Sequence, residues 1–202
     1  DYKQIGTTID DAVGEAFDKT AKILDLGYPG GPNIEKFSKL GNKNSYILPQ
    51  PIINRAGCNL SLAGLKTDVL RKSKNIKSNQ DKYDLAASFQ ETINKILTKK
   101  TEVAMMEFRK KVSDKSTRPF VVAGGVAANE TIRKSLKELS KKLKFKPIFP
   151  SKEFCGDNAA MIAWAGIQRY KKKLFSKNNE TVRSRWPLDK EAPFLKGPGL
   201  KL

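Results

Sequence analysis

Two adjacent glycines between a predicted strand and a predicted helix form the strongest candidate binding element. Residues 123–129 read Ala-Gly-Gly-Val-Ala-Ala-Asn and follow a short apolar run. Gly124 and Gly125 leave the backbone bare, so a ligand can approach closely, and the start of the next helix offers unpaired N–H groups to a phosphate. Neither a P-loop nor the dinucleotide-binding fingerprint is present. The segment therefore predicts either a nucleotide site or an ordinary tight turn.

Carboxylates near two predicted helix starts are the next candidates. Asp11, Glu15 and Asp18 are spaced by about one helical turn and should share a face. That face is either solvated or able to bind hydroxyls or Mg²⁺, and we expect Asp18 to be partly buried because it follows Phe17. Asp157 opens a later helix. Its default role is a helix cap, and the alternatives are a metal ligand or a group that orients a substrate.

A second glycine-rich segment, Tyr-Pro-Gly-Gly-Pro at residues 28–32, is predicted to be irregular backbone. Its glycines, Gly31 among them, either place further bare amides near the same ligand or simply stop the preceding helix. The residues alone leave both interpretations open.

Missing residue types exclude several mechanisms. The chain has no histidine, which excludes Ser-His-Asp and Cys-His catalysis and the zincin motifs, so no catalytic side chain is assigned. Cys58 and Cys155 are too few for a disulfide framework and are expected to be reduced thiols in a cytoplasmic protein. No apolar run is long enough to span a bilayer, so no membrane partner is predicted.

Positive charge is concentrated in one part of the chain. The formal net charge is +18, but residues 1–70 carry 8 basic and 8 acidic side chains. Residues 71–202 carry 31 basic and 13 acidic side chains. This asymmetry predicts a polyanionic partner such as nucleic acid. The alternative is a lysine-rich surface that only keeps the protein solvated.

The spacing of apolar residues predicts the elements that position these groups. A first helix should open at residues 8–11 and end by Gly27, and a long helix should cover residues 81–112. Between them, residues 41–67 are predicted to be a loop in which residues 47–49 and 52–53 form edge strands.

The region after residue 119 alternates strand and helix. We expect a buried strand at residues 120–123, a helix capped by Asn129 and ending near residue 143, a strand at residues 147–150 and a helix from residue 157. This order is typical of an α/β fold with a parallel sheet. We expect residues 176–202, which are basic and contain several prolines and glycines, to form a tail or arm.

Seven segments together resemble the tRNA threonylcarbamoyladenosine transferases, formerly described as O-sialoglycoprotein endopeptidases or glycoproteases. Spread over essentially the whole chain, they are Thr8-Ile9-Asp10-Asp11-Ala12, Gly14-Glu15-Ala16-Phe17-Asp18-Lys19, Gly27-Tyr28-Pro29-Gly30-Gly31-Pro32, Gly64-Leu65-Lys66-Thr67, Ala123-Gly124-Gly125-Val126-Ala127-Ala128-Asn129, Phe154-Cys155-Gly156-Asp157-Asn158-Ala159-Ala160-Met161-Ile162-Ala163 and Val182-Arg183-Ser184-Arg185-Trp186-Pro187-Leu188.

The resemblance implies the two-lobed sugar-kinase and actin fold, with the amino-terminal lobe missing here. Residues 1–175 would then form the carboxy-terminal nucleotide-binding lobe, which is incomplete. It implies transfer of a threonylcarbamoyl group from threonylcarbamoyl-AMP to the adenosine beside a tRNA anticodon. By motif, Asp18, Gly31 and Asn129 should contact the adenylate, or ATP as an alternative nucleotide ligand. Gly124 and Gly125 should form the floor on the phosphate side. A residue of the carboxy-terminal motif, Asp157, should be a ligand of one metal ion, either iron or zinc.

The sequence also departs from the family pattern. The family's amino-terminal half, which carries two metal-binding histidines, does not precede residue 1 in this sequence. Residues 59–64 read Asn-Leu-Ser-Leu-Ala-Gly where the family has Asp-Phe-Ser-Phe-Ser-Gly. These departures suggest one product of a split gene, a degraded copy or a truncated piece, with a repacked or less constrained loop at residues 59–64.

Three functional hypotheses follow. The first is a portion of the transferase that is inactive without its histidine-bearing half, or without partner subunits of the modification complex. The second is a non-catalytic remnant that binds RNA or protein. The third, ranked lowest, is the metallopeptidase of the older family description, because no nucleophile–base pair is present.

Overall fold

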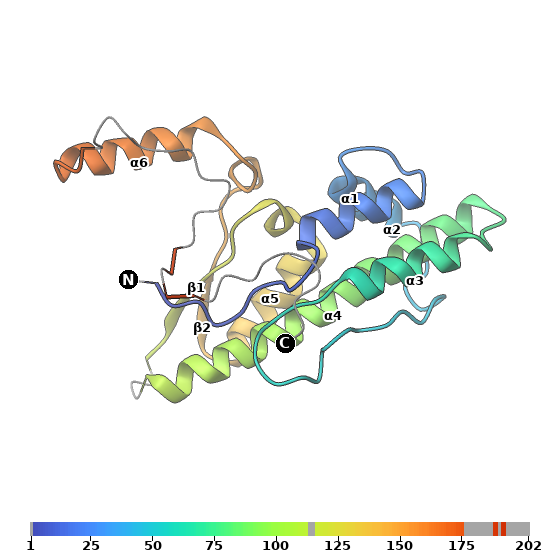
Figure 1. Cartoon of the computed structure of the whole chain (residues 1–202), viewed down its shortest axis with the longest axis horizontal. Helices are drawn as coiled ribbons and strands as arrows, with labels where there is room; N and C mark the ends of the chain where they lie inside the picture. Colours follow the sequence, from blue (N-terminus) through green and yellow to red (C-terminus); the bar gives the residue numbers. More distant parts are fainter. Residues whose placement is uncertain (1, 113–115, 176–187, 190, 193–202) are drawn as a thin grey trace.

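The longest helix, α4 (Asn79–Lys111), is the support on which the other elements pack (Figure 1). Its start is fixed by a capping box, in which Ser78 and Asp81 exchange hydrogen bonds of 2.9 and 3.1 Å between side chain and backbone. Its apolar stripe, which includes Leu85, Phe89 and Ile93, is fully buried. The predicted long helix is therefore confirmed to within two residues at each end.

A computed structural model describes residues 2–112, 116–175, 188–189 and 191–192.

Three helices from the first part of the chain lie beside α4: α1 (Val13–Ile23), α2 (Gly30–Ser38) and α3 (Ala63–Ser73) (Figure 1). Two aromatic pairs join α1 and α2 to α4. The rings of Phe17 and Phe89 meet edge to face at 5.3 Å, and those of Phe37 and Tyr83 stack at 5.1 Å. The start of α2 lies beside α1, where the backbone N–H of Gly30 donates a 2.9 Å hydrogen bond to Asp18.

Within the described residues the sheet has two strands, β1 (Arg118–Val121) and β2 (Phe145–Ile148). They run parallel, with Arg118 opposite Phe145 and Val121 opposite Ile148, and helix α5 (Glu130–Lys142) connects them. The predicted strand–helix–strand order and the mixed α/β class are confirmed. The expected burial of the first strand is wrong, because Val121 is 61% exposed. Side chains alternate between the two faces of a strand, and the described residues leave the Val121 side of this sheet open.

Helix α6 (Ala159–Lys171) follows a short 3₁₀ helix, η2 (Lys152–Phe154), and extends away from the other elements (Figure 1). No residue of α6 is buried against the described part of the chain. Ile162 is 67% exposed and Trp164 is 62% exposed. This helix therefore presents a large apolar surface.

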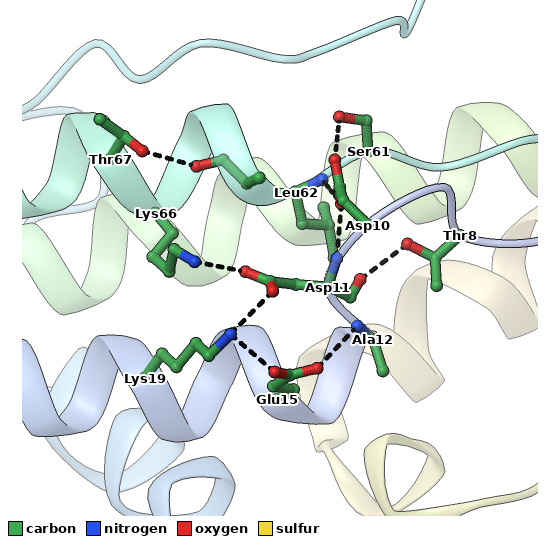
Figure 2. Close-up of polar contacts among 11 residues, drawn as sticks. Thr8, Asp10, Asp11, Ala12, Glu15, Lys19, Ser61, Leu62, Lys66 and Thr67 are labelled. Carbon is green, nitrogen blue, oxygen red and sulfur yellow. Dashed lines mark hydrogen bonds and ion pairs between the residues drawn. The ribbon is translucent and has the colours of Figure 1, made fainter. Parts of the chain in front are cut away.

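The first helix begins later than the sequence predicts. Thr8 does not cap it and instead forms a parallel bridge with Leu60, so residues 8–11 are extended or bent backbone. The carboxylate of Asp10 accepts hydrogen bonds from the backbone N–H of Leu62 and the hydroxyl of Ser61, at 2.7 and 2.5 Å (Figure 2). A pairing with residues 50 positions away decided this start, and local helix signals do not report such contacts.

Helices α2 and α3 lie where loops are predicted, and the edge strands predicted at residues 47–49 and 52–53 are absent. Pro32 is the third residue of α2, a position where its missing N–H leaves no helical hydrogen bond unmade. Burial of Ile34, and of Leu65 and Val69 in α3, stabilises these short helices. The Gly and Pro residues that suggested loops are tolerated because they fall in first turns or between helices.

Most of the predicted basic tail lies outside the described residues, which include only residues 188–189 and 191–192 after residue 175. These residues contact the start of the chain, where the carboxylate of Asp189 accepts a 2.7 Å hydrogen bond from the backbone N–H of Gln4. Across the described ranges, no helix is both long enough and apolar enough to cross a membrane.

Candidate functional site

A pocket of about 440 Å³ lies where α1, the start of α2, the glycine turn after β1 and the loop after β2 come together. Its lining includes the predicted residues Asp18, Gly31, Gly125 and Asn129. These residues are up to 111 positions apart in the sequence, and the fold brings them around one cavity. The remaining lining residues are Gly14, Phe17, Tyr28, Pro29, Pro32, Glu35, Val126, Ala128, Lys152, Cys155 and Gly156.

Asp18 is exposed at the pocket wall, and the expected partial burial is wrong. The preceding residue Phe17 is 2% exposed and belongs to the core. Oδ1 of Asp18 accepts a 2.9 Å hydrogen bond from the backbone N–H of Gly30, the first residue of α2. The carboxylate therefore satisfies one of the unpaired N–H groups at the start of that helix, and its other oxygen is left for a ligand.

Two glycines face the open side of the pocket. A side-chain carbon added to Gly31 or to Gly125 would meet nothing within 4 Å. A ligand can therefore reach the backbone at both positions. Because Gly31 lies in the first turn of α2, its N–H belongs to the set that has no partner within the helix.

Gly124 shapes the turn without lining the pocket. Its φ is +90°, which side-chain-bearing residues rarely adopt, so glycine is required here for conformation. The 3₁₀ turn η1 (Gly125–Ala128) follows directly. Gly124 therefore allows the sharp turn that connects the end of β1 to η1 at the pocket.

Asn129 caps α5 and also links two other elements. Its side-chain oxygen accepts from the N–H of Ile132 at 3.1 Å, and its Nδ2 donates to Oε1 of Gln90 at 2.7 Å. Gln90 in turn donates to the hydroxyl of Ser38 at 2.8 Å. This buried chain of hydrogen bonds ties α5, α4 and α2 together. An amide nitrogen carries two hydrogens, so one remains for a ligand.

The pocket lining also includes Glu35, Lys152 and Cys155, which were not among the predicted site residues. Glu35 accepts a 2.7 Å hydrogen bond from the backbone N–H of Glu130 at the start of α5, and Lys152 forms an ion pair with the Glu130 carboxylate. Isolated Glu and Lys residues carry no positional signal in a sequence, whereas Cys155 belongs to a family motif that could have indicated it. Their placement follows from the docking of α2 and η2 against α5.

Arg133 holds together the two loops that line one side of the pocket. Its guanidinium donates to the carbonyl of Ala127 in the glycine turn, and to the carbonyl of Pro150 at 2.6 Å and Sγ of Cys155 at 3.1 Å in the loop after β2. It also lies 5.1 Å from the ring centroid of Phe149. A planar guanidinium can make several such bonds at once, so Arg133 sets the distance between the two loops.

Asp157 is exposed and does not line the pocket, although its neighbour Gly156 does. It is not the helix cap, because Asn158 accepts the capping hydrogen bond from the N–H of Met161 at 2.9 Å. A protein metal site needs three or four donors. Among the described residues, no group of three His, Cys, Asp or Glu side chains could hold a metal. The described chain alone therefore does not fit a complete metal site.

Asp11, Glu15 and Asp18 do not form one cluster. Nζ of Lys19 pairs with Asp11 at 2.8 Å and with Glu15 at 2.6 Å, and Nζ of Lys66 pairs with the second oxygen of Asp11 at 2.8 Å (Figure 2). Burial alone would raise the pKa of Asp11, but the two lysines outweigh it and hold the pKa below its ordinary value. Asp11 and Glu15 therefore face Lys19, whereas Asp18 faces Gly30.

The segment that departs from the family pattern is hydrogen-bonded to the start of the chain. The side-chain oxygen of Asn59 accepts from the N–H of Thr7 at 3.0 Å, and Leu62 is 1% exposed. Ser61 donates to Asp10 at 2.5 Å (Figure 2). The substituted residues thus pack and bond as an ordered connection into α3.

Comparisons with known proteins identify the family of the chain. Residues 1–164 match the TsaD family, described as tRNA N6-adenosine threonylcarbamoyltransferase. A protein of that name from Pelagibacter ubique is 58% identical over 201 residues, which is 100% of this chain and 56% of the relative. One from Rickettsia rickettsii is 47% identical over 93% of this chain, and one from Brucella anthropi is 44% identical over 98%. The chain spans about half the length of these relatives. Since the family match covers most of its residues, the chain belongs to the TsaD family.

Proposed function

We propose that this chain is the nucleotide-binding portion of an enzyme that moves a threonylcarbamoyl group from threonylcarbamoyl-AMP to N6 of the adenosine beside a tRNA anticodon. The observation that supports this most is the single pocket lined by Asp18, Gly31, Gly125 and Asn129. These are four of the five residues to which the family resemblance assigns the adenylate. Because the proposed substrate is tRNA, we also propose a cytoplasmic location.

The pocket suggests a role for each group. The exposed oxygen of Asp18 would accept hydrogen bonds from ribose hydroxyls, and the remaining amide hydrogen of Asn129 would bind the nucleotide. The phosphate would lie against the bare backbone near Gly125, with Gly124 fixing that turn. The amino end of α2 at Gly31 would add partial positive charge.

The chemistry then needs little from these residues beyond binding and electrostatics. The adenosine amine forms a new C–N bond to the carbamoyl carbon, and the C–O bond of the mixed anhydride breaks. The bonding electrons leave on the phosphate of AMP, and the amine passes one proton to solvent. Backbone N–H groups at the glycine turn and at α2 would stabilise the negative charge of the departing AMP.

A complete enzyme would need the second lobe of the sugar-kinase and actin fold, and we propose that Asp157 supplies one metal ligand in that assembly. When bound, iron or zinc would act as a Lewis acid toward the acyl group. The other ligands would come from the histidine-bearing amino-terminal half or a partner subunit, because this chain contains no histidine. By this proposal the chain alone binds nucleotide but does not complete the reaction.

Calorimetric titration of the chain with AMP and ATP tests the pocket. Replacing Asp18 with Asn should weaken binding about tenfold, which corresponds to about 1.4 kcal/mol, and Asp25→Asn is the matched control because its carboxylate is 95% exposed and lies in the turn after α1. Equal affinities for the wild type and Asp18→Asn would reject this pocket as the nucleotide site.

A complementation assay tests the reaction. The chain is mixed with a histidine-bearing amino-terminal fragment of a relative, tRNA and threonylcarbamoyl-AMP, and the modified nucleoside is measured by mass spectrometry. Modification that requires both fragments supports the proposal. Unmodified tRNA, together with normal assembly of the two fragments, would reject it for this chain.

The second candidate function is a non-catalytic module that binds RNA. The excess of basic residues in 71–202 favours it. Salt-dependent tRNA binding without any affinity for AMP would support this alternative over the transferase.

A further inference from the structure

Three lysines form a stripe on the solvent side of α5. Lys134, Lys137 and Lys141 are all exposed, and their spacing of three and four residues places them on one face of the helix. We propose that this stripe, here called the α5 track, binds the phosphate backbone of RNA and leads it to the nucleotide pocket. The inference rests on the proposed function, because it names the surface that would hold the tRNA substrate.

The charge of the α5 track is largely uncompensated. Within the described part of the chain, neither Lys134 nor Lys141 has an acidic partner at ion-pair distance. Lys137 lies 5.5 Å from the ring centroid of Phe149. Glu138 is the one acid that lies among the three lysines on the helix. Residues 130–152 as a whole contain eight Lys or Arg and two Glu, so the positive potential extends to both sides of the helix.

Three exposed lysines on the long helix α4, by contrast, form ion pairs. On α4, Lys95 pairs with Glu91 at 3.7 Å, Lys99 pairs with Glu102 at 3.0 Å, and Lys110 pairs with Glu107 at 2.9 Å. Each of these cations already has a carboxylate beside it. Exposed lysines on this protein are therefore not equivalent, and the three of the α5 track share one helix face without a carboxylate partner at ion-pair distance among the described residues.

A groove beside the α5 track shares one lining residue with the nucleotide pocket. The groove has a volume of about 440 Å³ and is lined by the three track lysines, Lys152 and the neighbouring Glu130, Arg133 and Glu138. Lys152 lines both this groove and the nucleotide pocket. A polyanion on the track would thus pass Lys152 at the pocket wall.

The dimensions fit a nucleic-acid backbone. The seven helical steps from Lys134 to Lys141 span about 10 Å at ~1.5 Å per step. A duplex presents one phosphate charge per ~1.7 Å of its axis. A stretch of RNA of this length therefore offers enough phosphates to contact all three lysines at once.

The exposed face of α5 favours RNA over a protein or a membrane. The apolar residues of the helix, Ile132, Leu136 and Leu139, are all buried toward the core. Protein interfaces bury an apolar and aromatic centre, and membrane-binding helices insert an apolar face. The exposed face of α5 provides neither, whereas basic side chains alone are sufficient for phosphate contacts.

The test compares two triple variants that remove the same charge. In the first, Lys134, Lys137 and Lys141 are all changed to Gln, and in the second Lys95, Lys99 and Lys110 are changed to Gln. Binding of the chain to unmodified tRNA is measured by fluorescence anisotropy between 50 and 200 mM salt. Three phosphate contacts contribute a slope of about two in log K against log salt. The wild type should lose about 20-fold more affinity over this range than the α5 variant.

The control variant should keep the wild-type salt slope, and both variants should bind AMP with wild-type affinity. Equal losses in the two variants would show only general charge attraction and would overturn the α5 track. Failure of the wild type to bind tRNA would also overturn it, and binding of polyglutamate to the same lysines would instead identify an acidic protein partner. If AMP does not bind but the salt slope still depends on α5, the proposed function fails while the track survives.

Discussion

The backbone N–H of Gly30 lies 2.9 Å from Oδ1 of Asp18, and this hydrogen bond joins the middle of α1 to the first residue of α2. The approach is so close that a side-chain carbon on Gly30 would come within 2.5 Å of Cα of Asp18. The neighbouring Gly31 has no such contact, because the same atom there would meet nothing within 4 Å. Two adjacent glycines therefore serve different purposes, one in packing and one at the pocket surface.

We expect Gly30→Ala and Gly31→Ala to separate stability from binding. Overpacking at Gly30 should lower the free energy of unfolding by about 1–3 kcal/mol. Gly31→Ala should leave unfolding unchanged and weaken AMP binding, because its methyl group would enter the pocket. Urea unfolding and calorimetric titration of both variants measure the two effects. Similar losses of stability in the two variants would contradict the distinction.

Replacing Arg133 with Met should loosen the loop after β2. The change removes hydrogen bonds to the carbonyls of Ala127 and Pro150, each made by a charged donor. Such bonds contribute about 1.5–3 kcal/mol, and we expect a loss of about 3 kcal/mol together with faster amide exchange in residues 150–156. Arg133→Lys is the second variant, because a single ammonium cannot reach both loops, and full rescue by Lys would show that charge alone is responsible.

The stability of the chain should depend on pH through Asp11. Its pKa is lowered in the folded protein, because the hydrogen bonds and charges of Lys19 and Lys66 outweigh the effect of burial. The stabilisation is therefore fully present above the ordinary pKa of about 4 and is lost as the pH falls through the lower folded value.

Asp11→Asn should therefore destabilise the chain by about 1 kcal/mol at neutral pH, and its difference from the wild type should shrink below about pH 4. Thermal unfolding between pH 3 and 7 measures this. Asp25→Asn is the control, because its carboxylate is 95% exposed. If the difference in stability between the wild type and Asp11→Asn stays constant down to pH 3, Asp11 is not the group that links stability to pH.

The exposed face of α6 should make the isolated chain self-associate. Ile162 is 67% exposed and Trp164 is 62% exposed, and an apolar patch of this kind promotes association in water. Light scattering over a concentration series should show species larger than a monomer. Changing Ile162 and Ile167 to Gln should reduce them, whereas Ile47→Gln, at an isolated 91% exposed site, should not. A strictly monomeric wild type at high concentration would contradict this expectation.

Where the local signal was strong, the sequence predicted the structure well. The stripe of apolar residues that includes Leu85, Phe89 and Ile93 defined α4, and Asn129 marked the start of α5 by its capping side chain. The parallel pairing of β1 and β2 followed from the strand–helix–strand order. Each of these features depends on residues that are close in sequence, so periodicity and capping report them.

The elements that sequence reasoning placed wrongly depend on distant contacts. The late start of α1 results from pairing of Thr8 with Leu60 and from the hydrogen bonds of Asp10. The Gly-Gly-Pro start of α2 led to the prediction of irregular backbone, whereas the burial of Ile34 stabilises a helix there. Local rules could not anticipate either result, because the deciding free energy comes from partners that are far away along the chain.

The sequence by itself determined the family, the mixed α/β class, the missing histidines and the excess of basic residues in 71–202. Tertiary structure alone decided that Asp18, Gly31 and Asn129 line one pocket and that Lys152 joins this pocket to the lysines of α5. It also separated Asp11 and Glu15 from Asp18. The reason is physical: motifs record which residue types occur in which order, whereas a cavity and its electric field depend on how separate helices pack around a core.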